Sequence, residues 1–172
     1  MTCIVAIVHQ GAVFVGGDSA ASTDAMIETR RNAKVFRNGD YLFGYTGSIR
    51  IGQQLEYSEA LQPLPPGVDL VRHLVVHLVP MLQKLAGKEG INELIVAHGD
   101  RLCKINTDYS VADYQDHAAA GTGEPYAIGN LFDSKGTPET RICRALAAAE
   151  ANCPSVRAPF TVKSTRNEGD KS

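Results

Sequence analysis

The chain has 172 residues, enough for one domain with a full hydrophobic core. Apolar residues make up 44% of the sequence and charged residues 21%, which excludes a disordered or fibrous protein. The formal net charge of −2 gives no electrostatic reason to expect a nucleic acid or an anionic membrane as a partner. No stretch has the length and apolarity of a membrane helix, and the first residues lack the basic start of a secretion signal. We therefore expect a single domain over residues 1–172.

The cysteines indicate a reducing compartment. There are four of them, without CxxC spacing, and three lie in apolar stretches, as buried thiols do. We expect a cytoplasmic protein with free thiols. They stand at Cys3, Cys103, Cys143 and Cys153.

The N-terminal part of the chain has the patterns of β-strands. It opens with a β-branched apolar run, typical of a strand covered on both faces, and Asn38-Gly39 is typical of a hairpin turn. We expect two hairpins, formed by Thr2–Val8 with Ala12–Gly16 and by Ala33–Arg37 with Tyr41–Tyr45.

Two helices are expected next. Apolar residues recur at helical spacing over Ser48–Leu61 and again over Asp69–Ala86, and a proline-rich segment separates the two. Pro80 lies inside the second helix and should kink it, because proline has no N–H to donate.

The C-terminal half repeats the order of strands, helices and strand. The expected strands are Glu93–Ala97, Leu102–Asn106, Ser110–Tyr114 and Pro159–Lys163. The expected helices are Pro125–Phe132 and a second one that Thr137 caps, ending near Asn152. The polar tail 164–172 should be loose. Two stacked antiparallel sheets with a helix pair outside each would bury all apolar faces, so we expect an α+β fold, a four-layer αββα sandwich.

Thr2 becomes a candidate nucleophile if Met1 is removed. A free α-amino group has a pKa of about 7.7–8.0, so it can accept the hydroxyl proton of its own threonine without a histidine. Such a site needs a nearby cation, an acid to hold that cation, and backbone N–H donors for the oxyanion.

The residues that follow resemble the proteasome β subunits, and especially their bacterial HslV-type relatives, within the N-terminal nucleophile (Ntn) hydrolases. Asp18 lies sixteen positions after Thr2 (18 − 2), the family's offset for its buried aspartate. Lys34 lies thirty-two positions after Thr2 (34 − 2), the offset of the catalytic lysine. Phe43–Gly47 resembles the segment whose glycine donates the oxyanion N–H, and Gly44 is predicted for that role.

A further match lies at Gly121-Thr122-Gly123, which resembles the family's GSGxPxA loop with Thr122 at its serine. The resemblance implies that the hydroxyl of Thr122 lies near the nucleophile's amine. It also departs from the archaeal and eukaryotic β subunits, because Cys153 and Val156 align with an aspartate and a serine in those proteins. Two hydrogen bonds near the amine are therefore expected to be lost, and the HslV type is the nearer relative.

The resemblance implies a threonine endopeptidase in which Thr2 attacks the scissile carbonyl. We expect Ala20, Ala21, Tyr45 and Gly47 to bind the substrate, with a preference for apolar side chains before the cut. It also implies a homo-oligomeric ring, with two rings stacked, which a hexameric AAA+ ATPase feeds with protein substrates. No cofactor or catalytic metal is required. A structural monovalent or divalent cation near the loop after the last helix stays open.

Other interpretations remain open from the sequence. An amidohydrolase acting on small amides would use the same nucleophile, and a non-catalytic ring subunit would share the fold. Cys3 could serve as an N-terminal nucleophile if Thr2 were also removed, although the offsets to Asp18 and Lys34 favour Thr2. His73 and His77 have a metal-binding i, i+4 spacing, but their aliphatic neighbours favour a packed pair.

Overall fold

Two antiparallel sheets stacked face to face form the centre of the structure, a computed structural model that describes residues 2–22 and 26–166. The four-stranded sheet has the order β10-β1-β2-β11, and the five-stranded sheet has the order β5-β6-β7-β8-β9. The first is built from β1 (Ile4–His9), β2 (Ala12–Gly17), β10 (His117–Ala120) and β11 (Thr161–Ser164). The second is built from β5 (Val35–Asn38), β6 (Tyr41–Tyr45), β7 (Leu94–His98), β8 (Arg101–Ile105) and β9 (Val111–Tyr114).

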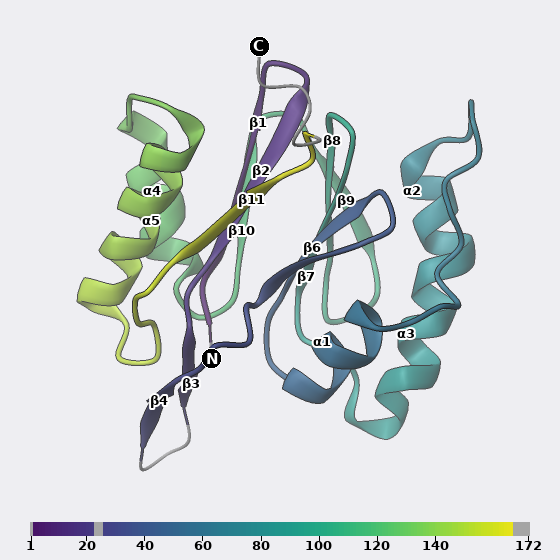
Figure 1. Ribbon diagram of the computed structural model, residues 1–172, viewed down its shortest axis with the longest axis horizontal. Coiled ribbons are helices and arrows are strands. Elements are labelled where there is room, and N and C mark those ends of the chain that lie inside the picture. The colour runs from purple at the N-terminus through teal and green to yellow at the C-terminus, as the bar shows by residue number, and fades with distance from the viewer. Residues whose placement is uncertain (1, 23–25, 167–172) are drawn as a thin grey trace.

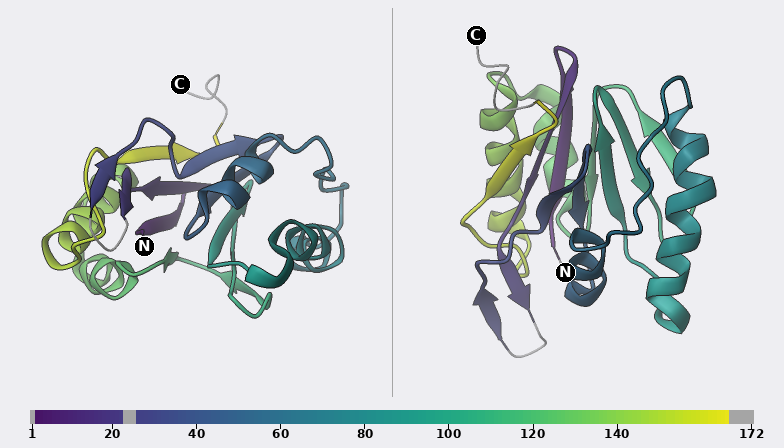
Figure 2. Two further views of the ribbon diagram at one scale, coloured as in Figure 1. Left: turned by 90° about the horizontal axis from the view of Figure 1, so that it is seen from below. Right: turned by 45° about the vertical axis from the view of Figure 1, so that its right-hand side comes forward.

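Helices cover the outer face of each sheet, which confirms the four-layer αββα sandwich (Figure 1). Helices α4 (Glu124–Asp133) and α5 (Pro138–Asn152) lie against the four-stranded sheet. The view from below shows the other helices on the opposite side of the two sheets (Figure 2). These are α1 (Ile49–Glu56), α2 (Leu70–His73), the π-helical η1 (Leu74–Leu78), α3 (Val79–Ala86) and the 3₁₀ turn η2 (Gly87–Glu89).

The opening strand is buried on both faces, as its sequence predicts. Ile4 and Ala6 pack between the two sheets, whereas Val5 and Ile7 pack against the α4–α5 layer. Burying each of the larger side chains contributes about 1.5–3 kcal/mol. β1 is therefore packed on both of its faces, and this packing fixes the position of the chain that leads into it.

Two elements were not predicted. β10 has the sequence His117-Ala-Ala-Ala, and alanine has a low strand propensity, yet β1 pairs with it along its length. The short hairpin of β3 (Ala20–Ser22) and β4 (Ile27–Thr29) projects from the end of the molecule where β1 begins (Figure 1). Tertiary pairing thus created strands where local sequence patterns were weak.

Three features of the helices and the tail differ from the predictions. The first helix ends at Glu56 rather than near Leu61. The second helix contains a π-helical turn, η1, directly before the segment with Pro80, so the missing proline N–H coincides with a change in helix type. The predicted tail begins too early, because Ser164 belongs to β11 and Thr165 bonds to both the backbone of Val13 and Gly99 O. The remainder of the tail, 167–172, lies outside the described residues.

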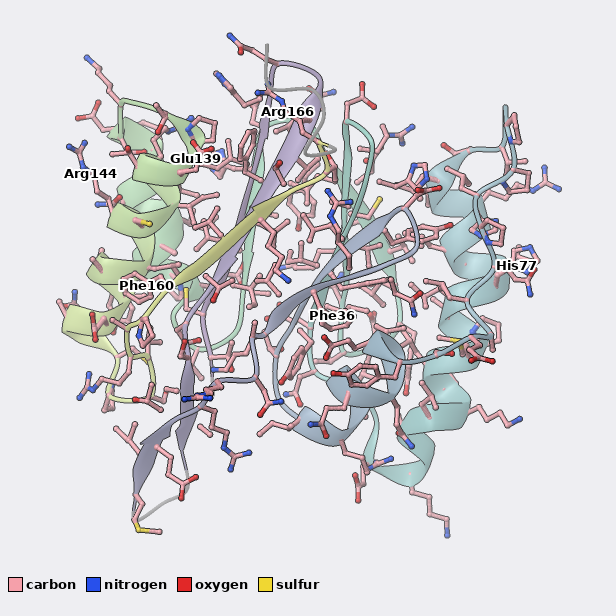
Figure 3. All side chains as sticks on the ribbon, viewed as in Figure 1. Phe36, His77, Glu139, Arg144, Phe160 and Arg166 are labelled. Carbon is pink, nitrogen blue, oxygen red and sulfur yellow. The ribbon has the colours of Figure 1, made fainter. Side chains whose placement is uncertain are left out.

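One residue of the histidine pair, His73, is packed, and the other, His77, is exposed. His73 is buried and its Nε2 lies 3.1 Å from Gln62 O, while the His73 and His77 rings are 4.6 Å apart. His77 lies on the outer side of its helix (Figure 3). None of the helices in the described part of the chain combines the length and apolarity that crossing a bilayer requires.

Candidate active site

Five segments that carry predicted site residues lie at the same end of the two sheets, where some strands begin and others finish. Thr2 lies two residues before the first residue of β1, and Asp18 directly follows β2. Lys34 directly precedes β5, and Gly47 comes just after β6. Since adjacent strands are antiparallel, the start of one lies beside the end of the next, so these residues meet. Thr122 joins them because β10 pairs with β1 and ends beside its start.

The structure brings Thr2, Asp18 and Lys34 together, as their sequence offsets predict. Lys34 Nζ donates to Thr2 Oγ1 at 2.9 Å and to Asp18 Oδ1 at 2.9 Å. The side chain of Lys34 is 7% exposed and that of Asp18 is fully buried. The ammonium group therefore bridges the hydroxyl and the carboxylate away from bulk water.

Backbone N–H groups hold the Asp18 carboxylate. Cys3 N–H donates to Oδ1 at 3.0 Å, and Ala20 and Arg157 N–H donate to Oδ2 at 3.0 and 3.4 Å. Burial lowers the pKa of Lys34, while the negative charge of Asp18 and its hydrogen bond oppose that shift. Lys34 is thus held beside the Asp18 carboxylate, in a buried site where an unpaired charge would be unfavourable.

Hydroxyl and thiol groups surround the backbone of Thr2 on its other side. Thr2 N–H donates to Thr122 Oγ1 at 3.4 Å, and Thr122 Oγ1 lies 3.1 Å from Ser155 Oγ. Cys153 Sγ lies 3.2 Å from Ser155 Oγ and 3.6 Å from Thr122 Oγ1. Ser155, one residue before Val156, supplies a hydroxyl to Thr122 that was not predicted, whereas the predicted loss of two hydrogen bonds at the amine stays a prediction. Burial would raise the Cys153 pKa, but the hydrogen bonds of Ser155 and Thr122 bring it below the ordinary value.

The glycines beside Thr122 are required by their close approach to the start of the chain. A Cβ on Gly121 would lie 2.3 Å from Thr2 O, and its φ is +90°. A Cβ on Gly123 would lie 2.6 Å from Cys3 Cβ, and its N–H donates to Thr2 O at 3.3 Å. The Gly-Thr-Gly sequence therefore serves packing against Thr2 and not phosphate binding.

A pocket of about 200 Å³ opens beside Thr2 and Lys34. All four residues predicted to bind substrate line it, namely Ala20, Ala21, Tyr45 and Gly47. Four further lining residues were not predicted, namely Met26, Glu28, Arg30 and Ile49. Three of these four belong to the β3–β4 hairpin or directly follow it, and that hairpin was not predicted.

The prediction that Gly44 donates the oxyanion N–H is wrong. Gly44 lies inside β6, which pairs with β5 and β7, so its N–H belongs to the sheet. It is a glycine because a Cβ there would lie 2.5 Å from Ile4 Cγ2 in the core between the sheets. Gly47 instead lines the pocket beside Thr2, with a φ of +74° that favours glycine.

Comparisons with known proteins give a fold but no sequence relative. The sequence matches no protein-family model and none of the curated proteins. Thiobacillus denitrificans BPH superposes with a TM-score of 0.81 at 17% identity, over 94% of this chain and 97% of BPH in its complex with epoxomicin. BPH alone gives the same values over 96% of its chain. Eukaryotic HslV from Trypanosoma brucei gives a TM-score of 0.71 at 17% identity, over 94% of this chain and 98% of HslV.

The chain has the HslV-type Ntn-hydrolase fold. At this level of identity the likeness concerns the fold alone, so the roles of the site residues are argued from their geometry. Ser155 was not predicted as a site residue. The signal that could have found it is its position two residues after Cys153, in the loop that follows α5. Arg30, which lines the pocket, was not predicted as a site residue either.

The loop after α5 is where a structural cation was expected. Three of its carbonyl oxygens accept hydrogen bonds: Cys153 O from Val156 N–H, Val156 O from the Arg157 guanidinium, and Arg157 O from Ser19 N–H. Within residues 2–22 and 26–166, no three His, Cys, Asp or Glu side chains are grouped as metal ligands. The structural cation in this loop stays a prediction.

Proposed function

We propose that this HslV-type chain is a threonine peptidase whose nucleophile is Thr2 after removal of Met1. The observation that carries the proposal is the position of one buried ammonium group, Lys34 Nζ, at 2.9 Å from both Thr2 Oγ1 and Asp18 Oδ1. A buried lysine that faces a hydroxyl at the start of the chain is costly for stability, and its use is to stabilise negative charge on that oxygen. The pocket beside it gives room for a substrate side chain.

The proposed reaction proceeds through an acyl-enzyme. Thr2 Oγ1 attacks the scissile carbonyl carbon while the α-amine of Thr2 accepts the hydroxyl proton. The C–N bond then breaks, and the amine returns the proton to the leaving nitrogen. Water attacks the ester carbonyl while the amine accepts one of its protons. The bond between the acyl carbon and Thr2 Oγ1 then breaks, the amine returns the proton to Oγ1, and the acid leaves. Lys34 stabilises charge on Oγ1 and, with Thr122, positions the amine.

Gly47 is proposed as the donor to the oxyanion. The neighbouring Thr46 N–H donates to Glu93 O at 3.2 Å, which fixes the backbone just before Gly47. A preorganised N–H at this position would be worth about 10²–10³ in kcat, as in other acyl-transfer sites.

Assembly and location are proposed from the likeness to HslV. Two stacked rings of identical subunits would enclose the pockets. A hexameric AAA+ ATPase would deliver protein substrates. A cytoplasmic location fits the free thiols of the four cysteines.

Intact mass measured with and without a peptide epoxyketone tests the proposal. The probe is epoxomicin, which BPH binds in its solved complex. Because an epoxyketone closes onto the hydroxyl and the amine of one residue, we expect loss of Met1 and one adduct per chain, mapped to Thr2. A chain that keeps Met1 would contradict the proposal. A processed chain without adduct that cleaves small acyl amides, but not fluorogenic peptides, would make it an amidohydrolase.

Gly47→Ala should lower peptide hydrolysis by about 10²-fold. The new Cβ would lie 1.9 Å from Asn92 Oδ1 and would need a φ of +74°, so the backbone at the pocket has to move. Gly39→Ala is the matched control, because Gly39 also has a positive φ, +57°, but has open space around it and is remote from Thr2. Equal activity in both variants, measured as kcat/KM with fluorogenic peptides, would remove Gly47 from the mechanism.

A further inference from the structure

A second buried charge cluster lies near Thr2. Lys104 is on β8 and shares a strand face with Leu102, which packs between the two sheets. Its side chain is 8% exposed, so its ammonium group needs partners to be tolerated there. It finds them in Glu93 Oε1 at 3.1 Å, Glu124 Oε1 at 3.0 Å and Ala119 O at 3.2 Å. Lys104 thus connects the five-stranded sheet to β10 and to the start of α4.

The two carboxylates keep Lys104 charged. Burial would lower the Lys104 pKa, but the ion pairs with Glu124 and Glu93 outweigh it and the pKa is raised. Both glutamates are more exposed than the lysine, at 24% for Glu93 and 30% for Glu124. The buried ammonium group of Lys104 therefore fixes the positions of the Glu93 and Glu124 carboxylates.

Glu93 differs from Glu124 in what else it binds. Its Oε2 accepts the Gly121 N–H at 2.8 Å, and its backbone carbonyl accepts Thr46 N–H at 3.2 Å and Thr46 Oγ1–H at 2.8 Å. The carboxylate of Glu124 is bonded to Lys104. Glu93 alone of the two therefore connects the segment 46–47 with the loop 121–123.

These two segments adjoin each other beside Thr2, where a Cβ on Gly121 would lie 3.2 Å from Thr46 Cγ2. Gly121 and Gly123 contact Thr2 O, and Thr122 binds the Thr2 nitrogen. Gly47 lines the pocket together with Thr2. We infer that Glu93, held by Lys104, is a positioning residue that sets the spacing between the loop that holds the Thr2 amine and the backbone that binds the oxyanion. This inference rests on the proposed function.

Glu93→Ala, Glu124→Ala and Glu93→Gln form a matched set of variants. Both alanine variants lose one carboxylate partner of Lys104, but only Glu93→Ala loses the acceptor for Gly121 N–H. We expect Glu93→Ala to slow epoxomicin adduct formation by about 10-fold or more, since a small misplacement of reacting groups is costly. Glu124→Ala should stay within about 3-fold of the wild type. Glu93→Gln should lie between the two alanine variants, because its amide oxygen can accept the Gly121 N–H while its NH2 group then faces the Lys104 ammonium group.

Thermal unfolding and amide hydrogen exchange are measured on the same proteins. Glu93→Ala should speed exchange in the peptide that contains Gly121, and Glu124→Ala should not. Equal losses of rate and of melting temperature in both alanine variants would overturn the inference, because Lys104 would then serve stability only. A wild-type rate in Glu93→Ala would also overturn it and leave the peptidase proposal standing. A wild-type chain that forms no adduct would overturn the peptidase proposal and the positioning role with it, whereas the exchange comparison would still decide whether Glu93 holds the Gly121 loop.

Discussion

Replacing Thr2 by alanine should lower peptide hydrolysis by at least about 10³-fold, because the nucleophilic oxygen is lost while the rest of the site remains. Asp18 keeps its three backbone N–H donors in this variant, and Lys34 keeps Asp18. The free energy of unfolding should change by only about 1 kcal/mol, the usual contribution of one hydrogen bond. The measurement is kcat/KM with fluorogenic peptides, together with intact mass to establish that residue 2 is the new N-terminus.

Thr2→Ser is the control, because it keeps the hydroxyl that Lys34 binds and should keep most of the activity. Cys3 is the competing nucleophile. Burial, followed by the negative charge of Asp18, raises the pKa of the Cys3 thiol to about 12, so it stays protonated at neutral pH. Activity that survives Thr2→Ala but disappears in Cys3→Ala would transfer the nucleophile to Cys3.

The candidate site could be predicted from the sequence where it depends on rigid strands. Asp18 and Lys34 each lie next to a strand end, β2 and β5, and the strands are held in register by their neighbours. A given number of residues between Thr2 and either Asp18 or Lys34 therefore corresponds to one position in the fold. The same holds for the fold, since the strand and helix patterns were strong enough to give the four layers.

Glycines show where such reasoning stops. Gly44 and Gly47 lie three positions apart in one segment, and both need to be glycine, but for different reasons. Gly44 has no room for a Cβ next to Ile4, whereas Gly47 has a positive φ at the pocket. Sequence alone does not separate a packing glycine from a backbone-donor glycine, which is why the first was chosen wrongly.

The long-range polar contacts of Lys104 could not be predicted from the sequence either. Lys104 looks like a solvent-facing residue in a strand, and Glu93 and Glu124 are separated from it by 11 and 20 positions. Only the stacking of β8 on β10 brings the three together and buries the lysine. β10 itself is a run of alanines whose strand conformation comes from pairing with β1.

Lys34→Met should lower kcat/KM at neutral pH by about 10³-fold and move the acidic limb of its pH profile upward by about one unit. Lys34 supplies positive charge beside Thr2, which favours the neutral α-amine that accepts the proton. Without that charge the amine binds its proton more tightly, so a higher pH is needed to free it. Lys84→Met removes a lysine from the exposed face of α3 and should leave both the rate and the profile unchanged. A profile that keeps its acidic limb in Lys34→Met would show that the lysine does not tune the amine.

Stability against pH gives an independent measure of the same group. Burial places the folded-state pKa of Lys34 below the ordinary value of 10.5, so at alkaline pH the unfolded chain binds more protons than the folded one. The free energy of unfolding of the wild type should therefore rise with pH between the folded-state pKa and 10.5, relative to Lys34→Met, in which the titrating group is missing. Chemical denaturation of both proteins across this window measures the difference, and parallel curves would mean that Lys34 titrates alike in the folded and unfolded chains. An upward slope in the wild type alone, together with the shifted acidic limb, would assign both effects to one buried ammonium group between Asp18 and Thr2.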